Sequence, residues 1–448
     1  MSTCVIRGGL VVTSTGARDA DVRIDGERIV DVGEDLPGGG VEIDAHGLVV
    51  MPGVVDVHVH FNEPGRTEWE GAATGSAALA AGGGTTFVDM PLNSTPCVLT
   101  AEDVDRKREA LEAASIADFG IWGGLVPGHV DDLPAMAQRG VMGFKAFMCD
   151  SGLPEFPRAD DETLRAGMIA ARALGLPIAV HAESETLTRA AAARTSGDDA
   201  AAFLASRPIE AELEAIARAL ALAKETGAAL HVVHVSSGKG VALAAEARAR
   251  GVDVSIETCP HYLTFTADDL ERLGVIAKCA PPFRDAAERE ALWTALADGT
   301  IDVVASDHSP APPSMRPSGQ FRRSWGGIAG VQSTLAVLIE RGFHERGVSL
   351  DRIAAIVAAM PARRFRIGRK GAIAPGRDAD LVLVDLAKTH VLRSEDLRQR
   401  HPSSPYVGQT FRGIVRRTIR RGETIFADGH VAAARGGRFL RPGGNDIC

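Results

Sequence analysis

The chain has 448 residues, of which 45% are hydrophobic and 24% charged, and its formal net charge is −9. These values are ordinary for a globular protein and leave room for one large domain with a smaller one. The negative charge argues against a nucleic-acid-binding surface, and no apolar run is long enough to cross a bilayer.

Cysteine usage and the first residues bear on the cellular compartment. The six cysteines are scattered and form no Cys-x-x-Cys pair, so neither a disulfide framework nor a structural zinc site is expected. The first residues lack the charged-then-apolar layout of a signal peptide. A cytoplasmic location is therefore the default expectation.

Both ends of the chain have the pattern of short β-strands separated by glycine-rich turns. Near the beginning these are residues 4–7, 10–13, 21–25, 28–32 and 41–44, and near the end they are residues 379–385 and 414–419. We therefore expect a small β-sandwich built from both termini, with residues 1–50 as its N-terminal part and residues 371–448 as its C-terminal part. Residues 51–370 would form a separate central domain.

The central domain alternates short apolar runs with long amphipathic, alanine-rich segments. The candidate strands span residues 54–60, 85–90, 119–125, 143–148, 177–182, 229–236, 253–258 and 301–307. The clearest helical segments span residues 160–174, 209–226 and 240–250. Eight β-then-α units predict an α/β fold of the (β/α)₈ barrel type. A doubly wound open sheet is the alternative, but no glycine-rich nucleotide-binding motif follows the first strand.

The first strand of this domain ends in two histidines spaced by one residue. Side chains alternate across a strand, so His58 and His60 point the same way and can share a metal ion such as Zn²⁺. For this pair alone, one packed and one solvated histidine is an alternative explanation.

Four other strands end in polar residues that suit the same site. They are Lys145, His181, His234 and Asp307. In a barrel the C-terminal ends of the strands meet at one mouth, so these side chains can converge with the histidine pair. His231 and His308 lie an odd number of positions from their neighbouring candidates and should point away.

Each of these residues also has a structural explanation. A single histidine at a strand end is often a packing residue, Lys145 can pair with an acid, and Asp307 can cap a turn. If each residue had only an independent structural role, four histidines, a lysine and an aspartate would rarely occur together at five strand ends. The ammonium of the lysine would repel a cation, but a carbamate made from its amine and CO₂ is anionic and can bridge two metals.

These residues resemble the metal set of the amidohydrolase superfamily, and more closely that of its cyclic amidohydrolases: the dihydroorotases, the hydantoinases (dihydropyrimidinases) and the allantoinases. Longer strings, which cover most of the chain, are most similar to the allantoinases. They are FNEPGRTEWEG (61–71), MPLNS (90–94), GFKAFM (143–148), DSGLPEFP (150–157), ETCPHYL (257–263) and WGGIAG (325–330). The resemblance implies a (β/α)₈ barrel with the two-ended sandwich.

The resemblance also implies a site with two divalent metal ions. The implied ligands are His58, His60 and Asp307 for one metal, His181 and His234 for the other, and N6-carboxylated Lys145 as the bridge. Zn is the expected metal, with Co, Mn and Fe as alternatives. A water activated between the metals would attack the ring amide, and Asp307 would carry its proton to the leaving nitrogen.

The sequence defines the substrate contacts less closely. Asn93 could bond a ureido or ring amide group, or could be a turn residue. Backbone groups near Cys279 and Gly327 resemble the family's ring-amide contacts, and glycine permits close approach to a ligand. The segment 311–323, rich in Pro, Gly, Ser and Arg, could be a mobile lid or a passive loop.

The reaction that the resemblance implies is hydrolysis of a cyclic amide, with allantoin and water giving allantoate in purine (ureide) catabolism. The alternatives are a hydantoinase (dihydropyrimidinase) or dihydroorotase and, outside enzymes, a non-catalytic dihydropyrimidinase-related scaffold protein. All six ligand positions are filled, which favours the enzyme. The expected partner is a small cyclic ureide, without nucleic acid or membrane, and the resemblance implies a homotetramer.

Overall fold

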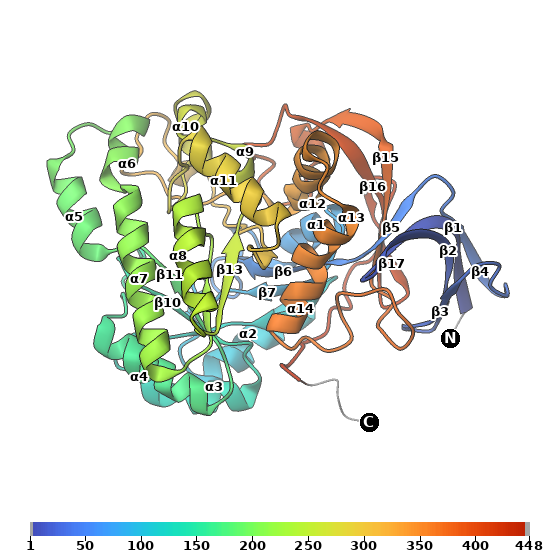
Figure 1. The fold of residues 1–448 in the computed structure, drawn as a ribbon, viewed down its shortest axis with the longest axis horizontal. Helices are drawn as coiled ribbons and strands as arrows, with labels where there is room; N and C mark the ends of the chain where they lie inside the picture. Colours follow the sequence, from blue (N-terminus) through green and yellow to red (C-terminus); the bar gives the residue numbers. More distant parts are fainter. Residues whose placement is uncertain (1–2, 444–448) are drawn as a thin grey trace.

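The first and last parts of the chain form one nine-stranded sheet in the computed structural model, which describes residues 3–443. The strand order is β18-β17-β16-β15-β5-β1-β2-β3, and β4 pairs with β1. Figure 1 shows the blue N-terminal strands beside the orange C-terminal strands at one end of the molecule. The strands are β1 (Thr3–Thr13), β2 (Gly16–Asp25), β3 (Arg28–Gly33), β4 (Val41–Asp44), β5 (Val49–Pro52), β15 (Leu381–Val391), β16 (Thr410–Arg420), β17 (Glu423–Ala427) and β18 (His430–Val431).

Strand β5 joins the two halves of this sheet. It pairs in parallel with β1 and antiparallel with β15, so the N-terminal strands and the C-terminal strands share one hydrogen-bonded layer. The sequence pattern does not single out β5, but its prediction that strands from both ends combine is confirmed. Alternating side chains such as Val11, Val22 and Leu383 give the sheet an apolar core of its own.

The central part of the chain forms a parallel barrel. One sheet holds β6-β7-β8, and a second holds β14-β13-β12-β11-β10-β9. Strands β8 and β9 are two halves of one expected strand, 119–125, interrupted at Trp122. The barrel strands are β6 (Val54–Val59), β7 (Gly84–Asp89), β8 (Asp118–Ile121), β9 (Gly123–Gly124), β10 (Phe144–Phe147), β11 (Ile178–His181), β12 (Leu230–Val232), β13 (Val254–Thr258) and β14 (Val303–Val304).

A parallel bridge between Val59 and His308 connects the first barrel strand to the chain that follows the last. The backbone N–H of His60 donates to the carbonyl of His308 across the same seam (2.8 Å). Buried Asp56 extends the seam, because its carboxylate accepts a hydrogen bond from the backbone N–H of Ser306 (3.2 Å). The expected eight-strand (β/α)₈ architecture is confirmed.

Helices surround the barrel, as Figure 1 shows for α2, α3, α4, α7, α8 and α11. The helices are α1 (Ala72–Ala81), α2 (Ala101–Ala114), α3 (Leu133–Arg139), α4 (Asp161–Ala173), α5 (Glu185–Arg194), α6 (Ala200–Ser206), α7 (Ile209–Thr226), α8 (Gly238–Ala249), α9 (Pro260–Thr264), α10 (Ala267–Leu273), α11 (Ala286–Ala297), α12 (Thr334–Val337), α13 (Leu350–Ala354) and α14 (Met360–Arg364). Two π-helical turns, η5 (Leu338–His344) and η6 (Ala355–Ala359), continue α12 and α13. Within the described residues, no helix is long and apolar enough to cross a membrane.

The strands are shorter than the sequence predicts, and this changes the setting of two polar residues. His234 lies beyond the end of β12, and Asp307 lies beyond the end of β14. Both adopt left-handed backbone conformations, with φ of 39° and 44°, in which a residue with a side chain is strained. The loops after the strands, rather than the strands themselves, therefore position these two side chains.

Candidate metal centre

Three ligand atoms converge where the first and last barrel strands meet. His58 Nε2 lies 3.2 Å from Asp307 Oδ1, and His60 Nε2 lies 3.4 Å from the same oxygen. Candidate ligand atoms of these three residues all lie within 4.8 Å of one another. Two imidazole nitrogens and a carboxylate oxygen at this spacing fit one divalent cation.

Two further histidines lie beside this group. His181 ends β11, and its ring stacks on Phe147 at 4.5 Å between ring centres. The centre of the His234 ring lies 4.6 Å from that of His181 and 5.5 Å from that of His58. Among the described residues, Nδ1 of His234 has no hydrogen-bond partner although it is buried. A buried histidine nitrogen without a partner suits a site completed by a ligand.

Lys145 projects from β10 into the same place and is 1% exposed. Burial lowers the pKa of its amine to about 8, although the carboxylates of Asp307 and Glu257 act in the opposite direction. Only an uncharged amine adds CO₂, so the lowered pKa makes the reactive form accessible near neutral pH. The local chemistry therefore fits a carbamate at this position.

One cavity of about 520 Å³ contains every residue that the sequence predicts for the site. Its walls include His58, His60, Asn93, Lys145, His181, His234, Cys279, Asp307 and Gly327. The residues that strand ends predict and those that the family resemblance implies therefore lie around one space, although no contact with a substrate is tested.

The three residues proposed to contact substrate differ in the length of the hydrogen bonds that their polar groups already make. Asn93 Nδ2 donates to Ser309 Oγ over a long 3.4 Å, and the Cys279 thiol donates to the carbonyl of Pro281 (3.3 Å). The N–H of Gly327 already donates to the carbonyl of Lys278 (2.7 Å). Gly327 has φ of 147°, and a Cβ there would lie 2.1 Å from the Ser309 carbonyl oxygen, so close backbone packing requires glycine.

The segment 311–325 covers part of this cavity and is held by cationic side chains. Lys278 Nζ donates to the carbonyl of Ser324 (2.6 Å), and Arg316 donates to that of Gly327 (2.7 Å). The Trp325 ring packs edge-on against Trp69 at 5.0 Å and lines the cavity. Arg322 adds hydrogen bonds to the carbonyls of Thr195 (2.6 Å) and Gly197 (2.9 Å), so several polar contacts attach the segment to the rest of the domain. Movement as a lid stays a prediction.

Sequence reasoning missed two buried acids that support the histidines. Glu183 Oε2 lies 2.8 Å from His181 Nε2, which leaves Nδ1 of that ring for a metal. Glu257 Oε1 lies 2.7 Å from His58 Nδ1, which leaves Nε2 for a metal. Burial opposes ionisation of both acids. The charge of Arg207 beside Glu183, and that of His58 beside Glu257, outweighs the effect of burial and lowers the pKa of each carboxyl to about 2. Buried acids in or just after strands that neighbour the histidines were the available sequence signal.

The expected orientations of His231 and His308 are correct in part. His308 points away from the cavity, and its Nε2 lies 3.3 Å from Glu70. His231 does not line the cavity either, yet its Nε2 lies 3.0 Å from Glu257 Oε2. His231 therefore contacts the site indirectly, through an acid that also holds His58.

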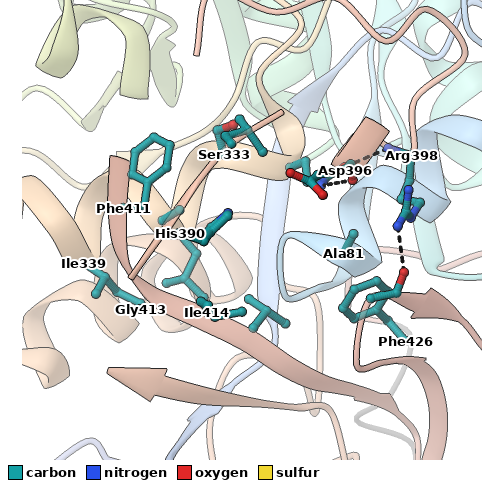
Figure 2. A pocket seen from close by; sticks show the side chains of 16 residues that line it. Ala81, Ser333, Ile339, His390, Asp396, Arg398, Phe411, Gly413, Ile414 and Phe426 are labelled. Atoms are coloured by element: carbon teal, nitrogen blue, oxygen red, sulfur yellow. Dashed lines mark hydrogen bonds between the residues drawn. The ribbon is translucent and has the colours of Figure 1, made fainter. Parts of the chain in front are cut away.

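A second cavity of about 230 Å³ lies between α1, the segment 332–339 and the C-terminal strands. Figure 2 shows apolar Ile339, Phe411 and Phe426 around it, with His390 and Arg398 among its polar groups. Arg398 is already bonded to the carbonyl of Gly429 (2.7 Å), and no predicted site residue lines this cavity. The candidate site residues all line the larger cavity.

Known proteins resemble this chain along its whole length. An allantoinase from Solibacter usitatus is 59% identical over 99% of this chain and 98% of its own, and one from Rubrobacter xylanophilus is 53% identical over 98% and 97%. Among solved structures, an L-hydantoinase (dihydropyrimidinase) from Arthrobacter aurescens superposes with a TM-score of 0.96 at 33% identity, covering 98% of this chain and 100% of that one.

The model of the amidohydrolase family matches residues 49–425, a span that contains all six candidate ligands. The family's structural neighbours have the same barrel, and the relatives align over the terminal strands as well. The resemblance inferred from the sequence motifs is confirmed, and the chain belongs to the amidohydrolase family.

Proposed function

We propose that this protein is an allantoinase, which hydrolyses the ring amide of allantoin to give allantoate. The observation that carries the proposal is the single 520 Å³ cavity that holds the whole predicted ligand set. The relatives named allantoinase, at 40% to 59% identity over 98% or more of this chain, favour allantoin as the substrate.

The six ligand side chains would hold two divalent cations. His58, His60 and Asp307 would bind one cation, His181 and His234 would bind the other, and carboxylated Lys145 would lie between them. Such a pair, when bound, polarises the scissile carbonyl and lowers the pKa of water enough to provide a nucleophile near neutral pH. Nitrogen and oxygen donors suit Zn, Co, Mn or Fe, and Zn is the first candidate.

Asp307 would serve as the proton carrier of the reaction. His58 and His60 outweigh the effect of burial and hold the pKa of its carboxyl well below its usual range, so it is ionised and able to accept a proton. It would take a proton from the attacking water and deliver it to the ring nitrogen as the C–N bond breaks. The carbonyl carbon gains the water oxygen, the ring nitrogen gains one proton of the water, and the other proton is released to solvent, so the products are a carboxylate, an N–H group and H⁺.

The remaining lining groups would orient the substrate. The long hydrogen bond of Asn93 is weak enough to be exchanged for one to a ureido group. Cys279 and Gly327 also line the cavity. We propose that these groups face the ring amide and its substituent, while the segment 311–325 limits the size of the ring that enters.

Assays of the purified protein on allantoin, hydantoin, dihydrouracil and dihydroorotate test the proposal. We expect the highest kcat/KM on allantoin. Turnover of another ring without turnover of allantoin would reassign the enzyme to a hydantoinase or dihydroorotase, and the L-hydantoinase neighbour makes the hydantoinase the second candidate. Absence of both bound metal and hydrolysis would instead favour a scaffold protein.

We also propose the domain organisation that the sequence predicts, with residues 51–370 as the catalytic barrel and residues 1–50 and 371–448 as the sandwich. The outermost residues, 1–2 and 444–448, lie outside the described part of the chain. A cytoplasmic homotetramer that acts on a small cyclic ureide completes the proposal. Light scattering coupled to size-exclusion chromatography tests the tetramer.

A further inference from the structure

One buried carboxylate contacts ligands from both halves of the candidate metal centre. Glu257 lies near the end of β13 and is fully buried. Its Oε1 lies 2.7 Å from His58 Nδ1 and accepts the backbone N–H of His234 at 3.1 Å. Its Oε2 lies 3.0 Å from His231 Nε2. His58 belongs to one proposed metal subsite and His234 to the other, so a single side chain reaches both.

The contact with His58 determines which ring nitrogen can bind a metal. An ionised carboxylate only accepts hydrogen bonds, so the proton of the neutral imidazole must lie on Nδ1. The lone pair is then on Nε2, the atom that lies 3.2 Å from Asp307 Oδ1. Glu257 therefore selects the tautomer of His58 that directs a free nitrogen into the site.

The contact with His234 stabilises a strained turn. The φ of 39° at His234 lies in the left-handed region, which costs a residue with a Cβ on the order of 1–3 kcal/mol. Glu257 supports this turn twice, because its carboxylate accepts the N–H of His234 and its backbone carbonyl accepts the N–H of Val235 (2.8 Å). The direction of the His234 ring depends on this backbone conformation.

The ring of His231 holds Glu257 in place through contacts of its own. His231 Nδ1 lies 2.7 Å from Ser255 Oγ, so the ring is held from both sides. The same ring packs edge-on against Phe365 at 5.1 Å and lies parallel to Trp122 at 6.4 Å. His231 therefore cannot rotate without displacing large buried side chains, and Glu257 keeps its orientation.

Glu183 provides a comparison within the same site. It bonds one histidine ligand, His181, and its other strong partner is Arg207 at 2.5 Å. It has no contact with His58 or with the backbone of His234 among the hydrogen bonds of the described residues. Loss of Glu183 should consequently affect one metal subsite, whereas loss of Glu257 should affect two.

We infer that Glu257 is a positioning residue that couples assembly of the two metal subsites, by setting the tautomer of His58 and the backbone turn at His234. The inference rests on the proposed binuclear site but not on the identity of the substrate. It predicts that the two metals are lost together when Glu257 is removed.

Metal stoichiometry tests the inference directly. The full chain, stripped of metal and reloaded with Co²⁺ and bicarbonate, is titrated for Glu257→Leu, Glu257→Gln and Glu183→Gln. We expect Glu257→Leu to retain less than half of the Co²⁺ bound by the wild-type chain, with no state of one tightly bound metal. For Glu183→Gln we expect one site to keep its affinity while the other weakens.

Glu257→Gln separates hydrogen bonding from charge. The amide oxygen can still accept from His58 and His234. The amide N–H₂ can donate to His231 Nε2 if the ring of His231 carries its proton on Nδ1 and donates it in a hydrogen bond to Ser255 Oγ. We expect both cobalt sites to fill in Glu257→Gln, with affinity about 10- to 100-fold weaker than wild type. This readout requires no turnover, so it does not depend on whether allantoin is the substrate.

Two results would overturn the inference. The first is Co²⁺ affinity equal to that of wild type in Glu257→Gln, or in a folded Glu257→Leu, together with a Tm that falls equally in the metal-free and the metal-loaded protein. Glu257 would then have a purely structural role. The second is sequential loss of the metals in the Glu257 variants that matches Glu183→Gln. If Glu257→Leu does not fold, the Glu257→Gln titration decides between the alternatives.

Discussion

Oδ1 of Asp307 lies 3.2 Å from Nε2 of His58, although the two residues come from opposite ends of the barrel sequence. The seam between β6 and the chain after β14 brings them together, through the bridge between Val59 and His308. The contact between the two ends of the barrel therefore also brings together the ligands of the first proposed metal subsite, one of which is the proposed proton carrier.

Replacing Asp307 by Asn should abolish turnover while leaving part of the metal bound. The amide keeps one oxygen near His58 and His60 but cannot accept and return a proton at neutral pH. We expect kcat to fall about 10³-fold or more, since general acid–base groups contribute up to roughly 10⁴-fold. Steady-state kinetics and metal analysis of the same preparation measure the two effects, and kcat within tenfold of wild type would exclude the proposed role.

Replacing Lys145 by Ala should remove metal and activity together. The variant lacks the amine that would carry the bridging carbamate, and the fully buried space it leaves is close to Asp307 and Glu257. A short-chain carboxylate such as propionate can enter this space and supply the missing bridge. We expect partial rescue of both metal content and turnover by propionate, whereas full activity without any added acid would refute the carbamate.

The rate of metal loading should rise with pH. Burial lowers the pKa of Lys145 to about 8, and below that value the neutral amine falls roughly tenfold per pH unit. The metal-free chain should therefore recover activity faster at pH 8.5 than at pH 6.5 when dissolved CO₂ and Zn²⁺ are held constant. Lys145→Ala with propionate is the matched control, and its rescue should rise less steeply because propionate is ionised throughout the range. The rise that remains comes from His58, which must lose its proton to bind a metal: burial lowers the pKa of its ring, but the carboxylates of Glu257 and Asp307 outweigh burial and raise it to about 9.

The sequence predicted the periodic parts of this molecule well. Helix α7 spans Ile209–Thr226, as expected, because its apolar spacing is strong and Gly227 ends it with φ of 68°. The candidate ligands were found for a related reason, since parallel strands deliver their ends to one mouth. A residue's position at the end of a predicted strand therefore predicted its position at the mouth of the barrel.

The missed features depend on contacts between elements that no local pattern encodes. Glu257 was seen only as part of a motif, because its partners belong to other elements: His58 lies on β6 and His234 in the loop after β12. The left-handed turns at His234 and Asp307 were missed because neither residue is a glycine. Both features are consequences of tertiary packing, which periodicity cannot supply.

Lys278→Met should loosen the segment over the cavity. The variant loses the hydrogen bonds to the carbonyls of Phe321 and Ser324, and also the contact of the ammonium with the Phe203 ring (5.1 Å to the ring centre). We expect faster tryptic cleavage within residues 311–325 and a several-fold higher KM for allantoin. Arg272→Met, at a side chain 65% exposed on α10, is the control and should change neither. Unchanged cleavage in Lys278→Met would mean that the segment is held by other contacts.

Lys370→Met should destabilise the junction between the barrel and the terminal sheet. Lys370 Nζ lies 2.6 Å from Asp118 at the start of β8, and 3.1 Å and 2.7 Å from Asp378 and Asp380 just before β15. All four side chains are almost fully buried, so removing the cation leaves three buried carboxylates in mutual repulsion. Breaking one buried pair in this way costs about 3–5 kcal/mol.

The matched control is Lys388→Met on β15. Its Nζ lies 3.8 Å from Asp385 and its side chain is 56% exposed, so the expected cost is about 0–1 kcal/mol. Calorimetry should show a clear fall of Tm for Lys370→Met and almost none for Lys388→Met. Because protonation of the carboxylates removes their repulsion, the deficit of Lys370→Met should also shrink as the pH is lowered. A Tm equal to wild type would mean that the neighbouring arginines compensate the charge, Arg421 at Asp118 and Arg369 at Asp378.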